Sequence, residues 1–492
     1  MAKYEFEYST CEKEGVDSQG VLNFIKRIKE KGILLHTFTM ARNGKIIAEI
    51  NAYPYENTYR HVMNSVTKTF TSIAVGIVYD RGLISLDDKI HKFFNNPSYK
   101  KNGLENATIR HLLTMTLGQE GPDMFASSEP EIDWCERMFD RPVNIPPGTQ
   151  FFYNSMATHL LSGIVTKVSG QNVSSLLKEN FFDPCGIEDY YWVEDPSGNS
   201  TGGVGIYLPN KELLKLGQLL LNKGVLNGHR VVSEEWCEMA TAKQVETLPA
   251  YTPNKTESIQ GYGFQMWRCT HNGFRASGLF GQLCVCIPDK NITFSINAST
   301  AGSQPLLDTF FETIYDCIYD EPLEEKPENY EKIKELSHLL DTHPVCANGS
   351  SHYEQIISGK ELKYRDKEGG ITLEFKPEGC TFTISDKRKS FSCVLGHNEF
   401  KHEPTDFDQY FMPISSAQDY AYPRPIGLKP ETYGSYTWIG VSHLRIMVMF
   451  KDHTCYNYWD IYFDDKRARV DETFTYLVEG YDYHTKNVLV MV

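Results

Sequence analysis

Apolar positions in the first part of the chain follow two different periods. From residue 69 to 82 they recur every three to four positions, with Phe70, Ile73 and Ile77 on one side of a helix that glycine ends. Three other segments share this period and this ending: 111–118, 159–170 and 213–224. The pattern predicts four helices, each with one face toward a core.

Other segments alternate apolar and polar residues, which is typical of β-strands. Residues 35–50 alternate around Asn43-Gly44, a dipeptide that favours a two-residue hairpin turn. Residues 282–296 show a second pair of such strands. Together with the helices, these strands predict an α+β fold in which helices pack on an antiparallel sheet, and we expect this domain to span residues 1–320.

The pattern changes after residue 320. Residues 321–343 are strongly charged, contain prolines and then become helical, which predicts a linker helix. Residues 344–492 consist of short alternating segments separated by turn residues, which predicts an all-β domain, a small barrel or a sandwich.

Composition narrows the possible partners and compartments. The formal net charge of −15 disfavours binding to nucleic acid or to an anionic membrane. The longest apolar run, residues 73–79, is far shorter than the roughly 18 residues that span a bilayer, and no signal peptide is visible at the start. The 12 scattered cysteines lack CxxC spacing and favour reduced, buried thiols. We therefore expect a cytoplasmic protein with a small-molecule partner, and the sequence leaves its oligomeric state open.

A serine followed three residues later by lysine occurs at three places, and chance alone produces a few such matches in a chain of this length. The pairs are Ser65/Lys68, Ser98/Lys101 and Ser175/Lys178. The second pair lies in a polar turn and the third on an amphipathic surface helix, so both are expected to be solvated.

Ser65 and Lys68 lie in a different context. On a helix they share one face, while the apolar stripe around Phe70 and Ile77 points almost the opposite way. A serine in the first helical turn lies among unpaired backbone N–H groups that stabilise an oxyanion. A desolvated lysine three residues on has a lowered pKa and can accept the serine proton. The alternative is a solvated pair on an ordinary surface helix.

A second candidate segment is Tyr153-Asn154-Ser155, at the start of a predicted helix after a Pro-Gly turn. A tyrosine beside a cationic lysine can move protons. The alternative is that Tyr153 is a packed aromatic residue and Ser155 an N-cap.

These motifs resemble the serine β-lactamase and penicillin-binding-protein superfamily, in the branch of class C β-lactamases, D-aminopeptidases and related esterases. The resemblance rests on segments in family order: "SVTKTFTSIAVGIVYDRGLISLDDKI", "TIRHLLTMTLG", "PPGTQFFYNSMATHLLSGIVTKVSGQNV", "FFDPCGIEDYYW", "LLKLGQLLLNKGVLNGHRVVSEEW" and "ASGLFGQLCVCIPDKNI".

The resemblance implies a role for each matched residue. Ser65 corresponds to the acylated nucleophile, and Lys68 and Tyr153 to the pair that exchanges protons with serine, leaving group and water. The oxyanion would be bound by the N–H groups of Ser65 and Leu279. Ser155 and the strand segment Ser277-Gly278 correspond to substrate-binding positions.

Two departures from the family pattern concern substrate binding. Ser155 replaces the usual asparagine of the second motif. Ala276 stands where the third motif has lysine or histidine, and the adjacent Arg275 should point to the other face of the strand. His271-Asn272-Gly273 has the wrong spacing for this motif and is expected to be a turn. Loss of a charge-assisted contact would weaken carboxylate binding by roughly 1.5–3 kcal/mol.

The sequence therefore predicts a serine hydrolase that cleaves small neutral esters, amides or lactones, with no cofactor or metal. The alternatives are a β-lactamase or D-aminopeptidase, and a non-catalytic binding or sensor protein on the same fold. Residues 120–142 are expected to form a cleft wall, where Trp134 and Phe125 either contact substrate or only pack.

Overall fold

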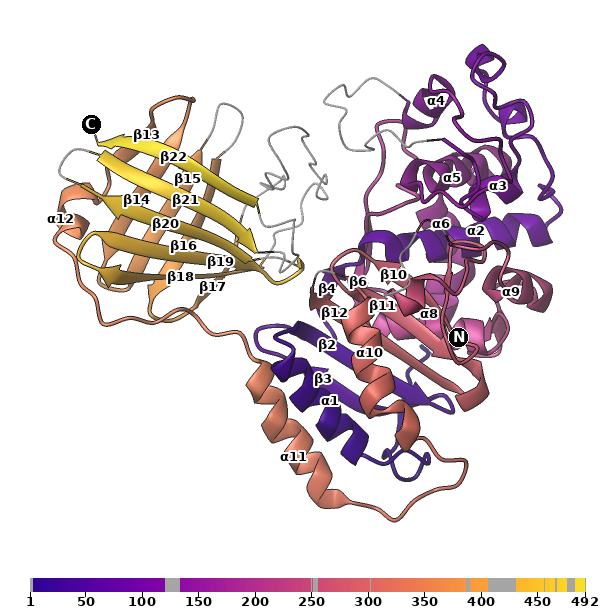
Figure 1. Ribbon diagram of the computed structural model, residues 1–492, viewed down its shortest axis with the longest axis horizontal. Helices are drawn as coiled ribbons and strands as arrows, with labels where there is room; N and C mark the ends of the chain where they lie inside the picture. Colours follow the sequence, from indigo (N-terminus) through magenta and orange to yellow (C-terminus); the bar gives the residue numbers. More distant parts are fainter. Residues whose placement is uncertain are drawn as a thin grey trace. The chain divides into compact units, whose positions relative to one another are not determined.

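The computed structural model describes residues 3–119, 133–248, 250, 255–300, 302–385, 390–405, 431–454, 456–464, 467–475 and 483–491 (Figure 1). The chain forms two compact units. The first comprises residues 1–298 and 302–340, and the second comprises residues 299–301 and 341–492.

The first unit is built on one mostly antiparallel sheet, whose short edge strand β1 pairs with its neighbour in parallel. Its strands in spatial order are β1 (Glu7–Tyr8), β3 (Lys45–Asn51), β2 (Leu34–Arg42), β12 (Ile292–Ser299), β11 (Gln282–Ile287), β10 (Phe274–Gly278) and β9 (Trp267–Arg268). Asn43 and Gly44, at φ 52° and 77°, form the predicted hairpin turn between β2 and β3.

Helices cover both faces of this sheet. On one face lie α1 (Gln19–Glu30), α10 (Gln304–Thr313) and α11 (Pro327–Ser337), and on the other lies α8 (Asn210–Leu221). Strand β11 shows the division residue by residue. Leu283 and Val285 join the core with α1 and α10, whereas the thiols of Cys284 and Cys286 contact the carbonyls of α8. The α+β fold predicted from the two periods is confirmed.

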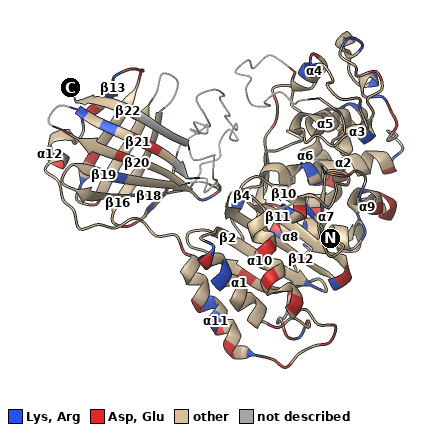
Figure 2. Cartoon of the chain, in the orientation of Figure 1, with Lys and Arg blue, Asp and Glu red and all other residues tan. Residues whose placement is uncertain are grey.

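Helix α11 packs with the first unit. Its Ile333 and the following Leu340 lie in the same core cluster as α1. Charges of both signs mark α1 and α11 in Figure 2, and acidic residues mark α10, consistent with amphipathic helices that keep their polar faces outward. The segment predicted as a linker therefore contributes a covering helix to this unit.

A mainly helical layer continues the first unit beyond α8 (Figure 1). Its helices are α2 (Thr67–Asp80), α3 (Ile109–Leu113), α4 (Trp134–Phe139), α5 (Ser155–Ser169), α6 (Val173–Leu177), α7 (Asp183–Cys185) and α9 (Glu234–Thr241). Small sheets join them: β4 (Arg60–Val62), β6 (Ile206–Pro209) and β5 (Tyr191–Trp192), and the hairpin β7 (Val225–Leu226) with β8 (His229–Arg230). Helices α2 and α5 pack against each other at the centre of this layer.

Helix α3 is shorter than the pattern predicts. It ends at Leu113, and Met115 has φ 57°, which turns the chain away from the helix. The side-chain amide of Gln265 donates to the carbonyls of Leu112 and Leu113 at 2.9 and 3.1 Å. A residue about 150 positions further along the chain thus satisfies the helix end, and local periodicity carries no sign of it.

The second unit is a closed β-barrel with the short helix α12 (Tyr353–Ile357). Its strands are β13 (Glu361–Tyr364), β14 (Gly370–Lys376), β15 (Gly379–Ser385), β16 (Ser390–His397), β17 (Lys401–Pro404), β18 (Glu431–Gly440), β19 (His443–Phe450), β20 (Tyr456–Phe463), β21 (Arg467–Thr475) and β22 (Tyr483–Met491). Pairing of β16 with β18 closes the ring, and inward side chains such as Trp438 and Ile446 fill it. A barrel, one of the two predicted architectures, is therefore present.

Within the described residues, no helix combines the length and the apolar character needed to cross a bilayer. The cysteines in this part of the chain are free thiols, and most of them are buried.

Candidate active site

Ser65 lies in a tight turn at the entrance to α2. The turn is a 3-10 helix, Asn64–Val66, and α2 begins at Thr67, so Ser65 precedes the helix whose first turn was expected to carry it. Asn64 adopts φ 46° and its side-chain amide donates to the Leu279 carbonyl and to Gln282 Oε1, each at 2.8 Å. These bonds fix the serine turn to the hairpin between β10 and β11.

Lys68 is buried directly beside this serine. Its Nζ donates to Ser65 Oγ at 2.9 Å, to Ser155 Oγ at 2.9 Å and to the Gly203 carbonyl at 2.7 Å. The residue is only 1% exposed, and burial lowers the pKa of Lys68 to about 7. A large fraction of this amine is therefore neutral at neutral pH. In that form it keeps two N–H donors, and its lone pair can accept the proton of the Ser65 hydroxyl across the same 2.9 Å contact.

Tyr153 forms an aromatic wall next to the lysine. Lys68 Nζ lies 4.9 Å from the centroid of its ring, and Trp267 stacks on the ring at 5.7 Å. Tyr262 meets it edge-on at 6.5 Å. The two motifs that lie almost ninety residues apart in the sequence thus meet around one amine.

Asn154 and Ser155, the last two residues of the Tyr153-Asn154-Ser155 segment, have different roles. Asn154, the N-cap of α5, accepts from the N–H groups of Met156 and Ala157 and donates to the Gln119 carbonyl. Ser155 is the first residue of α5, and its hydroxyl accepts from Lys68. The cap is therefore Asn154, and Ser155 is free of that structural task.

Strand β10 approaches the serine turn closely at Gly278. A Cβ at this position would lie 2.4 Å from the Met63 carbonyl oxygen and 3.2 Å from Asn64 Cβ. Ser277 is half-buried beside it, and Leu279 is 49% exposed at the start of the turn to β11. The predicted substrate-binding strand thus runs against the serine turn, and only glycine permits this approach.

We expect Gly278→Ala to lower both activity and stability, because the new methyl group forces β10 away from Met63. Overpacking of this kind costs about 1–3 kcal/mol. Thermal unfolding and the rate of ester hydrolysis measure the two effects. Gly302→Ala is the matched control, since a Cβ there meets nothing within 4 Å. Equal effects of the two substitutions would contradict the close-approach argument.

Arg275 points away from the position that a substrate carboxylate would take. Its guanidinium is buried, donates to the Glu257 and Arg268 carbonyls and lies over the Trp267 ring. Ala276, at the usual cation position, offers only a methyl group. This agrees with the expectation from strand alternation.

The remaining expectations lie further from the serine. His271 and Asn272, at φ 53° and 55°, form the turn between β9 and β10 that the spacing predicted. Trp134 is buried and packs against the His159 ring at 5.6 Å, which is the packing alternative. Phe125 lies outside the described residues.

The other two serine–lysine pairs are solvated, as their contexts predict. Lys178 is exposed and pairs with Asp183 at 2.5 Å, and Ser175 is exposed on α6. Ser98 lies in a polar 3-10 turn, and Lys101 is exposed. Burial of the lysine distinguishes Lys68 from both.

Several residues of the site carried no motif. Gly203 supplies a carbonyl to Lys68, Trp267 supports Tyr153, and Asn64 ties the serine turn to the hairpin between β10 and β11. Gln265, at φ 64°, bonds to α3 and accepts from the hydroxyls of Thr69 and Thr158. The run Gly202-Gly203 was a visible signal of close backbone packing, but no local pattern indicated what it packs against.

The arrangement joins a hydroxyl nucleophile, a buried amine with a pKa near neutrality and a tyrosine in one cluster. Such a cluster can transfer an acyl group to serine: the amine takes the hydroxyl proton as the oxygen attacks a carbonyl.

Comparisons with known proteins show the family and the fold. The Beta-lactamase family model matches residues 24–310. An uncharacterised protein of Alkalihalophilus pseudofirmus is 27% identical over 303 residues, 54% of this chain and 82% of its own. The 6-aminohexanoate-dimer hydrolase of Paenarthrobacter ureafaciens is 23% identical over 256 residues, 48% of this chain and 64% of the hydrolase. The octameric penicillin-binding protein homologue of Pyrococcus abyssi has a similar fold, with TM-score 0.50, 16% identity and coverage of 96% of this chain and 100% of that one.

Proposed function

Because this chain belongs to the Beta-lactamase family, we propose that it is a serine hydrolase that cleaves small neutral esters or amides through an acyl-Ser65 intermediate. The observation that carries the proposal is the 2.9 Å contact between Lys68 Nζ and Ser65 Oγ, made by an amine whose pKa burial lowers to about 7. A solvated lysine would be protonated and could not serve as the base.

The reaction proceeds in two halves. Ser65 Oγ attacks the substrate carbonyl carbon while its proton passes to Lys68, and the N–H groups of Ser65 and Leu279 bind the oxyanion. The carbon–oxygen or carbon–nitrogen bond then breaks, and the leaving group receives a proton through Lys68 and Tyr153. Water, deprotonated by the same pair, attacks the acyl carbon and restores the serine.

The substrate class follows from what the site lacks and from one relative. Ala276 replaces the cation that would bind a carboxylate, and Arg275 is occupied by backbone carbonyls. A neutral carbonyl compound therefore fits better than a β-lactam or a peptide carboxylate. Amides belong to the class because a relative is named 6-aminohexanoate-dimer hydrolase. Ser155, Ser277 and Gly278 would line the acyl group.

Two other functions compete with this one. A β-lactamase or D-aminopeptidase would need a carboxylate site, and a non-catalytic binder would have no use for a desolvated lysine. The buried Lys68, which the fold keeps at the cost of its solvation, favours an enzyme over a binder.

Intact-protein mass spectrometry after brief mixing with p-nitrophenyl butyrate tests the proposal. We expect a mass increment of one butyryl group that forms, decays and maps to the peptide that carries Ser65. Benzylpenicillin in a parallel sample should acylate much more slowly. Rapid acylation and turnover of benzylpenicillin would instead support a β-lactamase, and no adduct from ester, amide or lactam would support a binder.

A further inference from the structure

Two consecutive backbone carbonyls face helix α2 from the segment before β6. The Gly203 carbonyl accepts from Lys68 Nζ at 2.7 Å, and the Gly202 carbonyl accepts from Thr71 Oγ1 at 2.9 Å. A Cβ at Gly203 would lie 2.7 Å from the Ser155 carbonyl oxygen, so this segment also presses against the start of α5. The position of the Gly203 carbonyl sets one of the three directions in which the lysine donates.

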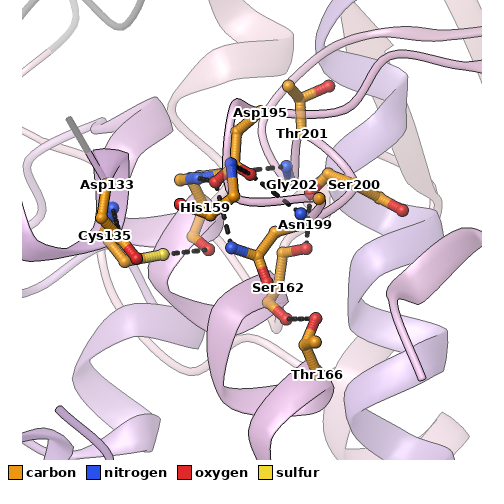
Figure 3. Close-up of polar contacts among 12 residues, drawn as sticks. Asp133, Cys135, His159, Ser162, Thr166, Asp195, Asn199, Ser200, Thr201 and Gly202 are labelled. Atoms are coloured by element: carbon orange, nitrogen blue, oxygen red, sulfur yellow. Dashed lines mark hydrogen bonds and ion pairs between the residues drawn. The ribbon is translucent and has the colours of Figure 1, made fainter. Parts of the chain in front are cut away.

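A buried histidine–aspartate pair holds this segment from the other side (Figure 3). His159 Nδ1 accepts from the Gly202 N–H at 3.3 Å, and His159 Nε2 lies 3.0 Å from Asp195 Oδ2. Both side chains are 0% exposed. His159 lies on α5 one turn after Ser155. The same helix therefore carries Ser155, which accepts a hydrogen bond from Lys68, and His159, which holds the segment with the Gly203 carbonyl.

The hydrogen bonds define the tautomer of this histidine. Because Nδ1 accepts from an amide, it carries no proton, and the proton on Nε2 is donated to Asp195. Asp195 also accepts from the N–H groups of Ser197 and Asn199 and from the Asn199 side chain. Burial alone would raise the pKa of Asp195, but the bonds from His159 and Asn199 lower it below its usual value, so the aspartate stays ionised and holds the tautomer.

The same residues form a potential metal cluster with Cys135, since their ligand atoms lie within 4.8 Å of one another. Their hydrogen bonds argue for another role. Each ring nitrogen of His159 and each oxygen of Asp195 already has a partner, as Figure 3 shows. Burial raises the pKa of Cys135 well above its usual value, which disfavours the thiolate that a metal needs. Its thiol instead faces the His159 carbonyl at 3.8 Å.

We propose that His159 and Asp195 are positioning residues for Lys68: the aspartate fixes the histidine tautomer, the histidine fixes Gly202, and the adjacent Gly203 carbonyl holds the amine against Ser65. The expected effect on kcat rests on the proposed function. The chain of hydrogen bonds from Asp195 to Lys68 does not depend on it. Neither residue touches the substrate.

Asp195→Asn tests the proposal because the new side-chain amide places an N–H donor where the aspartate accepted hydrogen bonds from other donors. If the new amide faces His159, the ring must carry its proton on Nδ1, which then opposes the Gly202 N–H. If the amide turns around, its N–H₂ group opposes the N–H groups of Ser197 and Asn199. Either arrangement displaces the segment that carries Gly203.

We expect kcat for p-nitrophenyl butyrate to fall about 10- to 100-fold with little change in KM, because the base is misplaced and substrate contacts remain. Water admitted beside Nζ should also raise the pKa of Lys68, so the acid limb of the kcat/KM profile moves to higher pH. Competitive amine labelling of Lys68, read by peptide mass spectrometry, measures that pKa without any turnover.

A second variant removes only the hydrogen bond between His159 and the Gly202 N–H, and it keeps the proposal testable if Asp195→Asn does not fold. In His159→Gln the terminal amide nitrogen can still donate to Asp195, but no acceptor stands at the position of Nδ1. The same loss in kcat and the same shift of the Lys68 pKa are expected. Asp460→Asn is the control: Asp460, which also pairs with Arg445, accepts from His443 at 2.7 Å in the barrel, so it measures the general cost of disturbing a His–Asp pair that is partly buried.

These measurements distinguish a positioning role of His159 and Asp195 from a metal site and from a failure of the proposed function. A folded Asp195→Asn or His159→Gln protein with the kcat and Lys68 pKa of the Asp460→Asn control would overturn the proposal. So would stoichiometric zinc in the purified wild type that is lost, with activity, in Cys135→Ala, because the cluster would then be a metal site. Failure of the wild type to acylate would refute the proposed function, while the labelling would still judge the hydrogen-bond chain.

Discussion

Ser65→Ala should abolish the acyl adduct and lower ester hydrolysis by about 10³-fold or more. The mutation removes the only atom that we assign to covalent catalysis, and the residual rate would come from binding and oxyanion stabilisation alone. Ser65 lies in the 3-10 turn before α2, where its hydroxyl accepts from Lys68 at 2.9 Å. Alanine fits this half-buried position without new contacts, so the fold should remain intact.

Ser175→Ala is the matched control for this result. Ser175 has the same serine–lysine spacing, but it is exposed and its lysine pairs with Asp183. Stopped reactions followed by intact-mass measurement compare the two variants with the wild type. The assignment of Ser65 would be wrong if its alanine variant acquired the same adduct at the same rate, or if Ser175→Ala lost it.

Lys68→Met should lower kcat/KM by about 10²- to 10⁴-fold, the usual contribution of a general base. Methionine keeps the length and apolar stem of lysine but cannot accept the serine proton. In the wild type, activity should fall as the pH drops below about 7, because protonation removes the base. If Tyr153→Phe retains measurable activity and the same acid limb, that limb belongs to Lys68.

The same substitution should leave stability unchanged or raise it near neutral pH. Unfolded Lys68 titrates at its ordinary pKa of 10.5, whereas burial lowers the folded value to about 7, so the unfolded chain binds the extra proton between these values. The free energy of unfolding of the wild type therefore carries a penalty on the order of 4 kcal/mol at neutral pH, which disappears as the pH rises toward 10.5.

Denaturant unfolding of both proteins at several pH values measures this effect. The advantage of Lys68→Met should be largest at and just below neutral pH and should shrink in alkaline solution. Loss of the bond to the Gly203 carbonyl offsets part of the gain, since a buried acceptor is left without its donor. A constant difference at all pH values would contradict a lowered lysine pKa.

Local order could be predicted from the sequence because it depends on neighbours along the chain. The period of apolar residues predicted α2 and α5 as helices, although both are buried on nearly every side and not on one face as expected, and Asn43-Gly44 predicted the β2–β3 hairpin. Strand alternation placed Arg275 away from the Ala276 face. Spacing alone put Ser65 and Lys68 within reach of each other.

Tertiary structure decided whatever depends on residues far apart in the sequence. Pairing of β16 with β18 made the second unit a barrel, because a sandwich and a barrel share the same strand pattern until the ring closes. Gln265 ended α3 early, since a helix end stops where a distant partner satisfies its carbonyls.

The same division explains the candidate site. Three serine–lysine pairs look alike in the sequence, and only burial among Ser155, Gly203 and the Tyr153 ring lowers a lysine pKa. The sequence by itself determined which side chains lie next to one another on an element. Solvation, which decides their chemistry, is set by every element that packs around them, and so only the tertiary structure could assign it.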